Sequence, residues 1–323
     1  MGTSPGPLGR LTIEPSPAAG PPVVVIVGAA ARDIAADDPR GWRLGGGVSY
    51  SALTVARLGI PTAAIVGVDE EASQAAELDL LRAAGVNVRL VPLDRGPIFV
   101  NIERPEGREQ LSLSPSDLVP VSAVPDAWRA ARGWILAPVA AELPAAWAEV
   151  PAPSAIVAVG WQGLLRELTA GAPVRHLPPG PNPLIERADL VGLSRDDVDP
   201  ETELAALCRL LHPGATMVVT QGDRGGLVLE AGPDGPAHAR LYPAVRSHAP
   251  VDPTGAGDVF LAALAAARIE PGLLRLRPDL DLLLAAAAAS LVLEGPGLHG
   301  VPELGAVVER MAAAQRGHQP AVS

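Results

Sequence analysis

The segment that most constrains the fold of this chain covers residues 251–268. It begins Val-Asp-Pro-Thr-Gly-Ala-Gly-Asp and continues Val-Phe-Leu-Ala-Ala-Leu-Ala-Ala-Ala-Arg. This order predicts a strand end, a glycine-rich turn and the first turns of a helix. Gly255 and Gly257 permit backbone conformations that a side chain would forbid. The helix N-terminus would present amide N–H groups to an anion, and Asp258 directly follows the turn.

A carboxylate beside an anion site has a chemical use if it accepts a proton while the amides stabilise developing negative charge. For an isolated Gly-x-Gly, a turn with a helix-capping Asp would explain Asp258. The whole motif from Asp252 to Asp258, however, resembles the signature of the ribokinase-like sugar kinases, also called the PfkB family. The resemblance implies that Asp258 is the general base. It also implies that the amides of Gly255, Ala256 and Gly257 form the anion hole.

The composition excludes several other chemistries. The chain has 323 residues, a net charge of -11 and 48% apolar residues, which suits one large α/β domain or two smaller ones. The negative charge, without a local basic patch, argues against a nucleic-acid partner. All 25 basic residues are Arg, which excludes a lysine phosphate loop and Schiff-base chemistry. Cys208 is the single cysteine, so no intrachain disulfide can form, and a buried small side chain is expected there.

The ends of the chain differ from its middle. Residues 1–22 are rich in Pro and Gly, predict a disordered tail and lack the apolar core of a secretory signal. The most apolar long segment, 280–293, is too short to span a bilayer, so a cytoplasmic protein without a membrane partner is expected. A kinase domain is expected at residues 23–315, followed by a short tail at 316–323.

An Asp follows the first expected strand. Residues 23–27 are a continuous apolar run, typical of a strand buried on both faces, and lead through small residues to Asp33. In the resembling family an Asp at this place binds substrate hydroxyls, so Asp33 is expected to bind the acceptor. A solvated loop Asp is the alternative.

Residues 45–59 predict a glycine turn that leads into a helix. They resemble the first signature of the family, in which paired glycines, here Gly45 and Gly46, pack against the sugar. Tyr50 stands where ribokinases usually carry Asn. This change alters both volume and hydrogen bonding, so the substrate need not be ribose. Ala72 likewise replaces the last Gly of the family motif Gly-x-Asp-x-x-Gly.

Residues 98–113 form two β-rich runs around a Pro-Glu-Gly turn and predict a hairpin. In the resembling kinases such strands form a small sheet that covers the sugar. Lid segments are therefore expected at about 33–44 and 96–115, and a simple edge hairpin is the alternative.

The second half of the chain alternates strands and helices. The expected strands are 133–137, 155–159, 190–192 and 217–220, with helices at 145–149 and 201–211. This alternation predicts a mostly parallel sheet with helices on both faces, whose ligands bind beyond the carboxyl ends of the strands. The resemblance makes the expected fold class α/β: a ribokinase-like, doubly wound sheet with a small β lid.

The nucleotide would lie at a second glycine motif. Thr220, Gly222 and Gly225 match the Thr-x-Gly-x-x-Gly that wraps the nucleotide in the family, and Arg224 could reach a phosphate. A hairpin loop is the alternative for this motif alone. Small residues at 285–294, Ala289 among them, would flank the adenine or simply pack against the sheet.

The expected metal sites depart from the family pattern. Ser194 and Asp197 occupy the positions of the family's Asn-x-x-Glu, which helps to place Mg²⁺ and the phosphates. Asp197 could still bind water molecules of a Mg²⁺ ion. The resemblance further implies that Asp252 and Thr254 bind K⁺ beside the anion hole.

These observations predict an ATP-dependent kinase for a hydroxyl of a small sugar or polyol. A nucleoside kinase and a myo-inositol-type cyclitol kinase remain open as alternatives, and so does a homodimer. The altered motifs also leave open a pseudokinase that binds nucleotide or sugar without turnover. A Rossmann dehydrogenase is excluded because no Gly-x-Gly-x-x-Gly follows the first strand.

Overall fold

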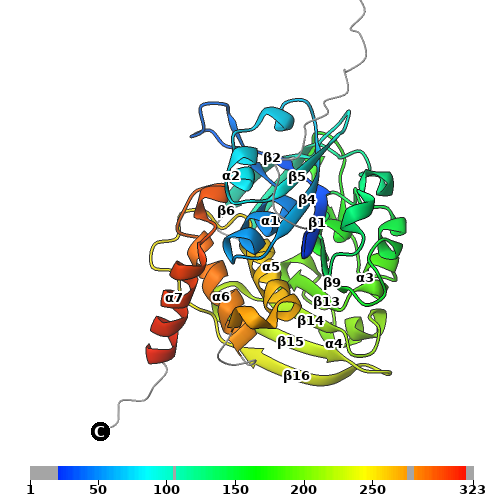
Figure 1. Ribbon diagram of the computed structural model, residues 1–323, viewed down its shortest axis with the longest axis vertical. Helices are drawn as coiled ribbons and strands as arrows, with labels where there is room; N and C mark the ends of the chain where they lie inside the picture. The colour runs from blue at the N-terminus through cyan, green and yellow to red at the C-terminus, as the bar shows by residue number, and fades with distance from the viewer. Residues whose placement is uncertain (1–20, 105–106, 275–279, 318–323) are drawn as a thin grey trace, which may run out of the picture.

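The computed structural model describes residues 21–104, 107–274 and 280–317, so most of both expected tails lies outside the described residues. A nine-stranded sheet forms the centre of the molecule (Figure 1). Its spatial order is β16 (Pro236–Tyr242), β15 (Gly226–Ala231), β14 (Thr216–Thr220), β13 (Leu190–Ser194), β9 (Ile156–Gly160), β8 (Gly133–Leu136), β1 (Val24–Ala29), β4 (Thr62–Val68) and β5 (Asn87–Pro92). The strands from β14 to β5 run parallel, and β15 and β16 add an antiparallel edge.

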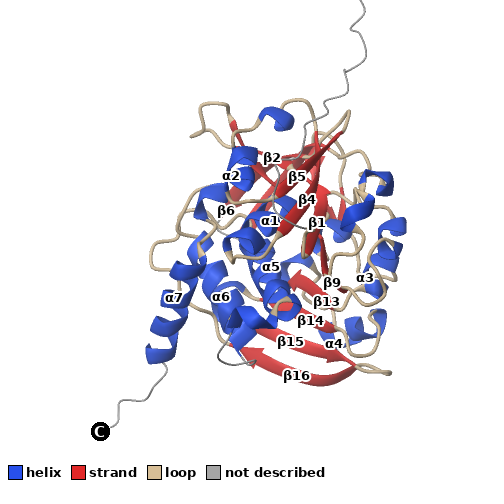
Figure 2. Cartoon of the chain, viewed as in Figure 1, coloured by secondary structure: helices blue, strands red, loops and turns tan. Residues whose placement is uncertain are grey.

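Helices cover both faces of this sheet (Figure 2). One face carries α1 (Gly47–Arg57), α2 (Glu77–Ala83), α5 (Ala256–Ile269), α6 (Asp281–Val292) and α7 (Leu304–Gly317), and the other carries α3 (Pro183–Arg187) and α4 (Leu204–Leu207). Each face has its own buried apolar cluster. The predicted doubly wound α/β class is confirmed.

Small residues bring α5 close to the centre of the sheet. A Cβ added at Gly192 of β13 would lie 3.1 Å from Leu261 Cδ1 of α5. Because α5 is rich in Ala and other apolar residues and is buried along most of its length, it packs directly on the strands. This contact fixes the N-terminus of α5 near the carboxyl ends of the central strands.

A second sheet lies beside the carboxyl end of β1. Its order is β11 (Ala172–Pro173), β7 (Gly107–Ser114), β6 (Ile98–Arg104), β2 (Ala31–Ile34) and β3 (Trp42–Gly45). The chain passes from β1 into β2 through a single buried residue, Ala30. The two sheets are therefore joined by continuous extended chain. A further two-stranded ribbon pairs β10 (Arg166–Glu167) with β12 (Arg175–His176).

Several short elements differ from the expectation. The helix expected at 201–211 is reduced to α4 and a 3-10 turn at Cys208–Leu210, and 145–149 is a 3-10 helix that begins after Pro144. Isolated short helices form few hydrogen bonds, so packing rather than helical pattern decides their length.

The strands β5 and β16 were not expected. Both alternate apolar and polar residues at the edges of the sheet, and β16 is exposed at six of its seven positions. Cys208 is fully buried, as predicted.

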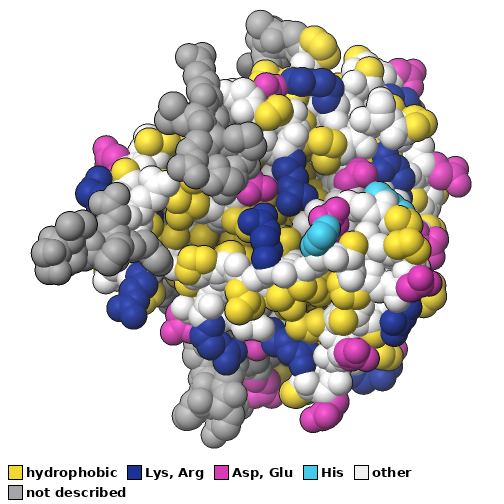
Figure 3. All heavy atoms as spheres, turned by 90° about the horizontal axis from the view of Figure 1, so that it is seen from below, with side chains coloured by type: hydrophobic (Ala, Val, Ile, Leu, Met, Phe, Trp, Pro, Cys, Tyr) yellow, Lys and Arg dark blue, Asp and Glu magenta, His cyan; other side chains and the backbone are white. Residues whose placement is uncertain are grey.

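Figure 3 shows arginine and acidic side chains interspersed over the face seen from below, with hydrophobic side chains between them. Within the described ranges, no helix combines the length and the apolar character needed to cross a membrane.

Candidate active site

The site is built around the N-terminus of α5. Gly255 is its N-cap and has a φ of 79°, a left-handed conformation that favours glycine. The first-turn amides of Ala256, Gly257 and Asp258 are those that an α-helix leaves without intrahelical acceptors. The Ala256 N–H makes a long 3.4 Å contact to the oxygen of Pro253. A Cβ at Gly257 would meet no atom within 4 Å, so the turn is open above this residue.

Tyr50 supports this turn from below. Its side chain is 1% exposed, and a Cβ added at Gly255 would lie 2.4 Å from Tyr50 Cδ1. The ring therefore packs against the backbone of the turn, and only glycine fits at position 255. The sequence-predicted substrate residue Tyr50 thus lies under the predicted anion hole as well as at the edge of a cavity.

Burial raises the pKa of Asp258 from 3.8 to about 7. Arg166 acts in the opposite direction, and the carboxylates of Asp197 and Asp33 raise the pKa further. The residue as a whole is neither fully buried nor fully exposed. These four charged groups come from α5, β10, a turn after β13, and β2, so the fold assembles them from distant parts of the sequence. A carboxylate with this pKa can accept a proton near neutral pH.

A cavity of about 230 Å³ lies between the second sheet and the loops around α5. Its polar lining includes three carboxylates, those of Asp33, Asp37 and Asp252, and one guanidinium, that of Arg43. Arg43 forms an ion pair with the exposed Asp37. The lining is therefore mainly acidic.

The carboxylate of Asp33, which lines this cavity, is held by hydrogen bonds within the second sheet. Asn101 Nδ2 of β6 donates to Asp33 Oδ1 at 3.2 Å, and Gln110 Nε2 of β7 donates to Asn101 Oδ1 at 2.7 Å. Sequence reasoning missed both amides, although Asn101 and Gln110 are directly paired across the hairpin. The pairing register of the hairpin, which places the two amides opposite each other, could have indicated both residues.

Gly45 and Gly46 pack against protein atoms rather than lining this cavity. A Cβ at Gly45 would lie 2.3 Å from Asp33 Oδ2, so the glycine makes room for that carboxylate. At Gly46, where φ is 92°, a Cβ would lie 2.6 Å from the oxygen of Ala29. The paired glycines therefore let β3 and α1 approach the crossing from β1 to β2.

Asp252 joins two loops at the rim of the cavity. Its Oδ1 accepts from the N–H of Thr254 at 2.9 Å, and its Oδ2 accepts from the N–H of Gly297 at 3.0 Å. Asp252 and Thr254, the residues predicted to bind K⁺, are thus both in the site. Each oxygen of Asp252 already accepts one hydrogen bond and keeps a further lone pair.

The predicted nucleotide residues lie along the ends of neighbouring strands. Ser194 and Thr220 are direct partners at the carboxyl ends of β13 and β14. Arg224 is exposed in the turn after β14, where Gly222 and Gly225 have positive φ. A Cβ at Gly225 would lie 2.1 Å from the oxygen of Tyr242, so this glycine lets the turn approach the chain after β16. Ala289 lies half-buried on α6.

Asp197 is already engaged by two hydrogen bonds. Its Oδ2 accepts from the N–H of Ser194 at 2.9 Å, and its Oδ1 accepts from Gln162 Nε2 at 2.7 Å. The carboxylate is 5% exposed and is a neighbour of Asp258. Among the described residues, no group of three or more His, Cys, Asp or Glu is arranged to hold a metal ion. Asp197 fits a contact to metal-bound water better than a place in a cage of protein ligands.

Sequence reasoning also missed Arg166. Its guanidinium lies 6.0 Å from the ring centre of Phe99 on β6, and its charge lowers the pKa of Asp258. It follows a 3-10 turn in an irregular segment, where neither helical nor strand periodicity marks a functional side chain. Only the three-dimensional structure brings it to the site.

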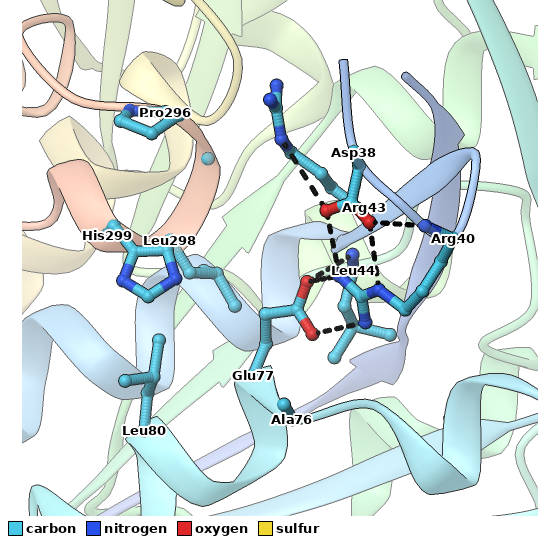
Figure 4. A pocket seen from close by; sticks show the side chains of 11 residues that line it. Asp38, Arg40, Arg43, Leu44, Ala76, Glu77, Leu80, Pro296, Leu298 and His299 are labelled. Carbon is cyan, nitrogen blue, oxygen red and sulfur yellow. Dashed lines mark hydrogen bonds and ion pairs between the residues drawn. The ribbon is translucent and has the colours of Figure 1, made fainter. Parts of the chain in front are cut away.

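A second cavity of about 230 Å³ lies beside the first and shares Arg43, Leu44, Pro296 and Gly297 with it. Figure 4 shows Arg40 reaching both Asp38 and Glu77 at its edge. The charged groups of this cavity are paired with one another, and most of its remaining lining is apolar.

The sequence of residues 184–303 matches the family model of pfkB family carbohydrate kinases. No curated protein matches the chain. Among solved structures, a pyrophosphate-dependent kinase in the ribokinase family, complexed with a pyrophosphate analog and myo-inositol, is 18% identical, with a TM-score of 0.68, over 90% of this chain and 99% of that one.

Two further structures have the same fold. Arabidopsis thaliana ribokinase, complexed with ribose and ATP, is 19% identical, with a TM-score of 0.63, over 90% of this chain and 99% of that one. The Methanocaldococcus jannaschii nucleoside kinase is 15% identical, with a TM-score of 0.62, over 91% and 100%. The family match includes Asp258 and the glycine turn that carries it. Residues 184–303 thus match the pfkB carbohydrate kinase family, as the motifs predicted, and the chain has the fold of ribokinase-family structures.

Proposed function

We propose that this kinase transfers the γ-phosphoryl group of ATP to a hydroxyl of a small sugar or polyol, with Asp258 as the general base. The observation that carries the proposal is the position of Asp258. It lies in the first turn of α5, has a pKa raised to about 7, and has Asp33 of the acceptor cavity as a charged neighbour. A base with a pKa near the working pH combines a useful ionised fraction with proton affinity.

The residues would act in a defined order. Asp258 accepts the proton of the acceptor hydroxyl as its oxygen forms a bond to the γ-phosphorus and the bond from phosphorus to the bridging oxygen of ADP breaks. The amides at the start of α5 stabilise the negative charge on the transferring group. Arg166 adds a positive charge near the same carboxylate. The second sheet, through Asp33, orients the hydroxyl.

ATP would lie across Ser194, Thr220 and the turn at Gly222 to Gly225, with Ala289 beside the base. Mg²⁺ bound to the phosphates would neutralise part of their charge, and Asp197 would hold its water molecules. K⁺ would bind at Asp252 and Thr254 and stiffen the loop before the anion hole. The hydrogen bonds from Asp252 to two loops support such a stiffening role for this residue.

The acidic lining of the cavity favours an uncharged acceptor. Three carboxylates and one paired arginine would repel a phosphate or carboxylate group on the acceptor but can accept hydrogen bonds from several hydroxyls. A polyhydroxylated ring such as a cyclitol fits this chemistry, and the similar kinase of known structure is complexed with myo-inositol. We therefore favour a neutral sugar or cyclitol over a sugar phosphate. A nucleoside is the alternative acceptor.

The test is Asp258→Asn, assayed by ADP release with the best acceptor from a panel of sugars, cyclitols and nucleosides. We expect kcat to fall by about 10²–10⁴, the usual worth of general acid–base catalysis, while ATP binding is retained. Retention of more than about a tenth of kcat would remove Asp258 from the mechanism. Acceptor and ATP binding without turnover in the wild-type protein would instead support the pseudokinase.

A further inference from the structure

Gly47, the third of three consecutive glycines, lies beside the proposed catalytic carboxylate. It is buried and is the first residue of α1. A Cβ added there would lie 2.8 Å from Asp258 Oδ1, 3.2 Å from the Cβ of Ala137 and 3.3 Å from the oxygen of Ala137. A contact of 2.8 Å is shorter than two such atoms tolerate, so a side chain at position 47 would displace the carboxylate or its surroundings.

This contact brings two helix N-termini together. Asp258 is in the first turn of α5, and Gly47 opens α1, whose first intrahelical bonds run from Ser49 and Tyr50 back to Gly46. The amides of Gly47 and Val48 belong to the turn that lacks intrahelical acceptors, and the α1 dipole favours negative charge at this end. On this side, Asp258 is therefore confined by the backbone of Gly47.

We propose that Gly47 is a positioning residue for phosphoryl transfer: the missing side chain lets the Asp258 carboxylate rest against the N-terminus of α1 and fixes the direction in which it receives the proton. This inference rests on the proposed role of Asp258. The proposed role of Gly47 differs from the roles of Gly45 and Gly46, which make room for Asp33 and for the crossing from β1 to β2.

The first test is Gly47→Ala, with Gly305→Ala as the matched control. Both glycines lie at the start of a helix with ordinary φ, but a Cβ at Gly305 would meet no atom within 4 Å. Since Ala is the better helix former, helix propensity alone predicts no loss for either variant. We expect Gly47→Ala to lower kcat at least about tenfold, because a displacement of about 1 Å can cost about 10²-fold. KM values and the activity of the control should stay within about threefold of wild type.

The pH profile distinguishes positioning from a general structural effect. The methyl group introduced by Gly47→Ala would push the carboxylate away from the N-terminus of α1. The loss of the partial positive charge at that helix end disfavours the ionised form. The acid limb of the kcat profile should therefore move to higher pH in Gly47→Ala and not in Gly305→Ala. An unchanged kcat and an unchanged profile would overturn the inference.

Two double variants test whether Gly47→Ala acts through Asp258 or through Ala137. If Gly47→Ala acts through Asp258, then Gly47→Ala/Asp258→Asn should be no slower than Asp258→Asn alone, whereas multiplied losses would overturn the inference. Ala137→Gly removes the other close side chain, so recovery of activity in Gly47→Ala/Ala137→Gly would assign the effect to Ala137 instead.

A stability measurement needs no substrate. If Gly47→Ala lowers the melting temperature, then Asp258→Ala, which removes the contacted oxygen, should restore it; failure to restore it would contradict the contact. The result of this stability measurement does not depend on whether Asp258 is the catalytic base. If Asp258→Asn kept its activity, the catalytic role would be wrong while the stability coupling could still be present.

Discussion

Asp258, the proposed general base, lies in an environment that disfavours a charged carboxylate. Its raised pKa means that the folded protein holds the proton of this carboxyl more tightly than the unfolded chain does. The stabilisation from this difference is fully present below about pH 4 and is lost as the pH rises through about 7. At the pH where the base is ionised and active, it therefore destabilises the fold.

We expect Asp258→Asn to raise the melting temperature, and to raise it more at pH 8 than at pH 5. The neutral amide avoids the burial of a negative charge, and that burial matters only where the native carboxyl is ionised. Thermal melts over this pH range would measure the effect. The fully exposed Asp126, changed to Asn, is the control, and a difference between wild type and Asp258→Asn that does not vary with pH would contradict the expectation.

At the scale of elements, the junction between the two sheets depends on Gly46. Its φ is positive, and a Cβ there would lie within 3.1 Å of backbone atoms of Ala29, Ala30 and Ala31, so no side chain fits. We expect Gly46→Ala to destabilise the protein by about 2 kcal/mol more than Gly59→Ala. Gly59 also has a positive φ, but a Cβ there would meet nothing within 4 Å, so this control isolates the steric term. Denaturant unfolding measures the difference, and equal losses would show that Gly46 is needed for its φ alone.

The sequence predicted those elements whose signal is local. The strand 23–27 and the glycine turn before α5 have clear apolar runs and punctuation, and both are present. The position of Arg166 or the pairing of Asp197 with Gln162 could not be read in this way, because each depends on contacts between segments far apart in the chain. Motifs at strand ends predicted which side of the sheet holds the site, and tertiary packing determined which charges face Asp258.

At the scale of the whole molecule, ligand binding should stabilise the two joined sheets and α5 as one unit. A ligand that binds only the folded state stabilises it by about 2.7 kcal/mol at a hundredfold excess over Kd. We expect neutral polyols to raise the melting temperature in the presence of Mg²⁺, and sugar phosphates to leave it unchanged because of the acidic cavity. Thermal melts with ATP and with pyrophosphate would also compare donors. A larger effect of sugar phosphates would contradict the proposed acceptor class.

The passage of the chain from β1 into β2 through Ala30 also has a consequence for local opening. Strand β1 lies inside the nine-stranded sheet with every residue buried, so its amides should exchange with solvent hydrogen only in the rarest openings. Because β2 continues that strand, the part of the second sheet that carries Asp33 is tied to the slowest-exchanging region. Local opening of the second sheet is therefore expected in the hairpin of β6 and β7 before it reaches Asp33.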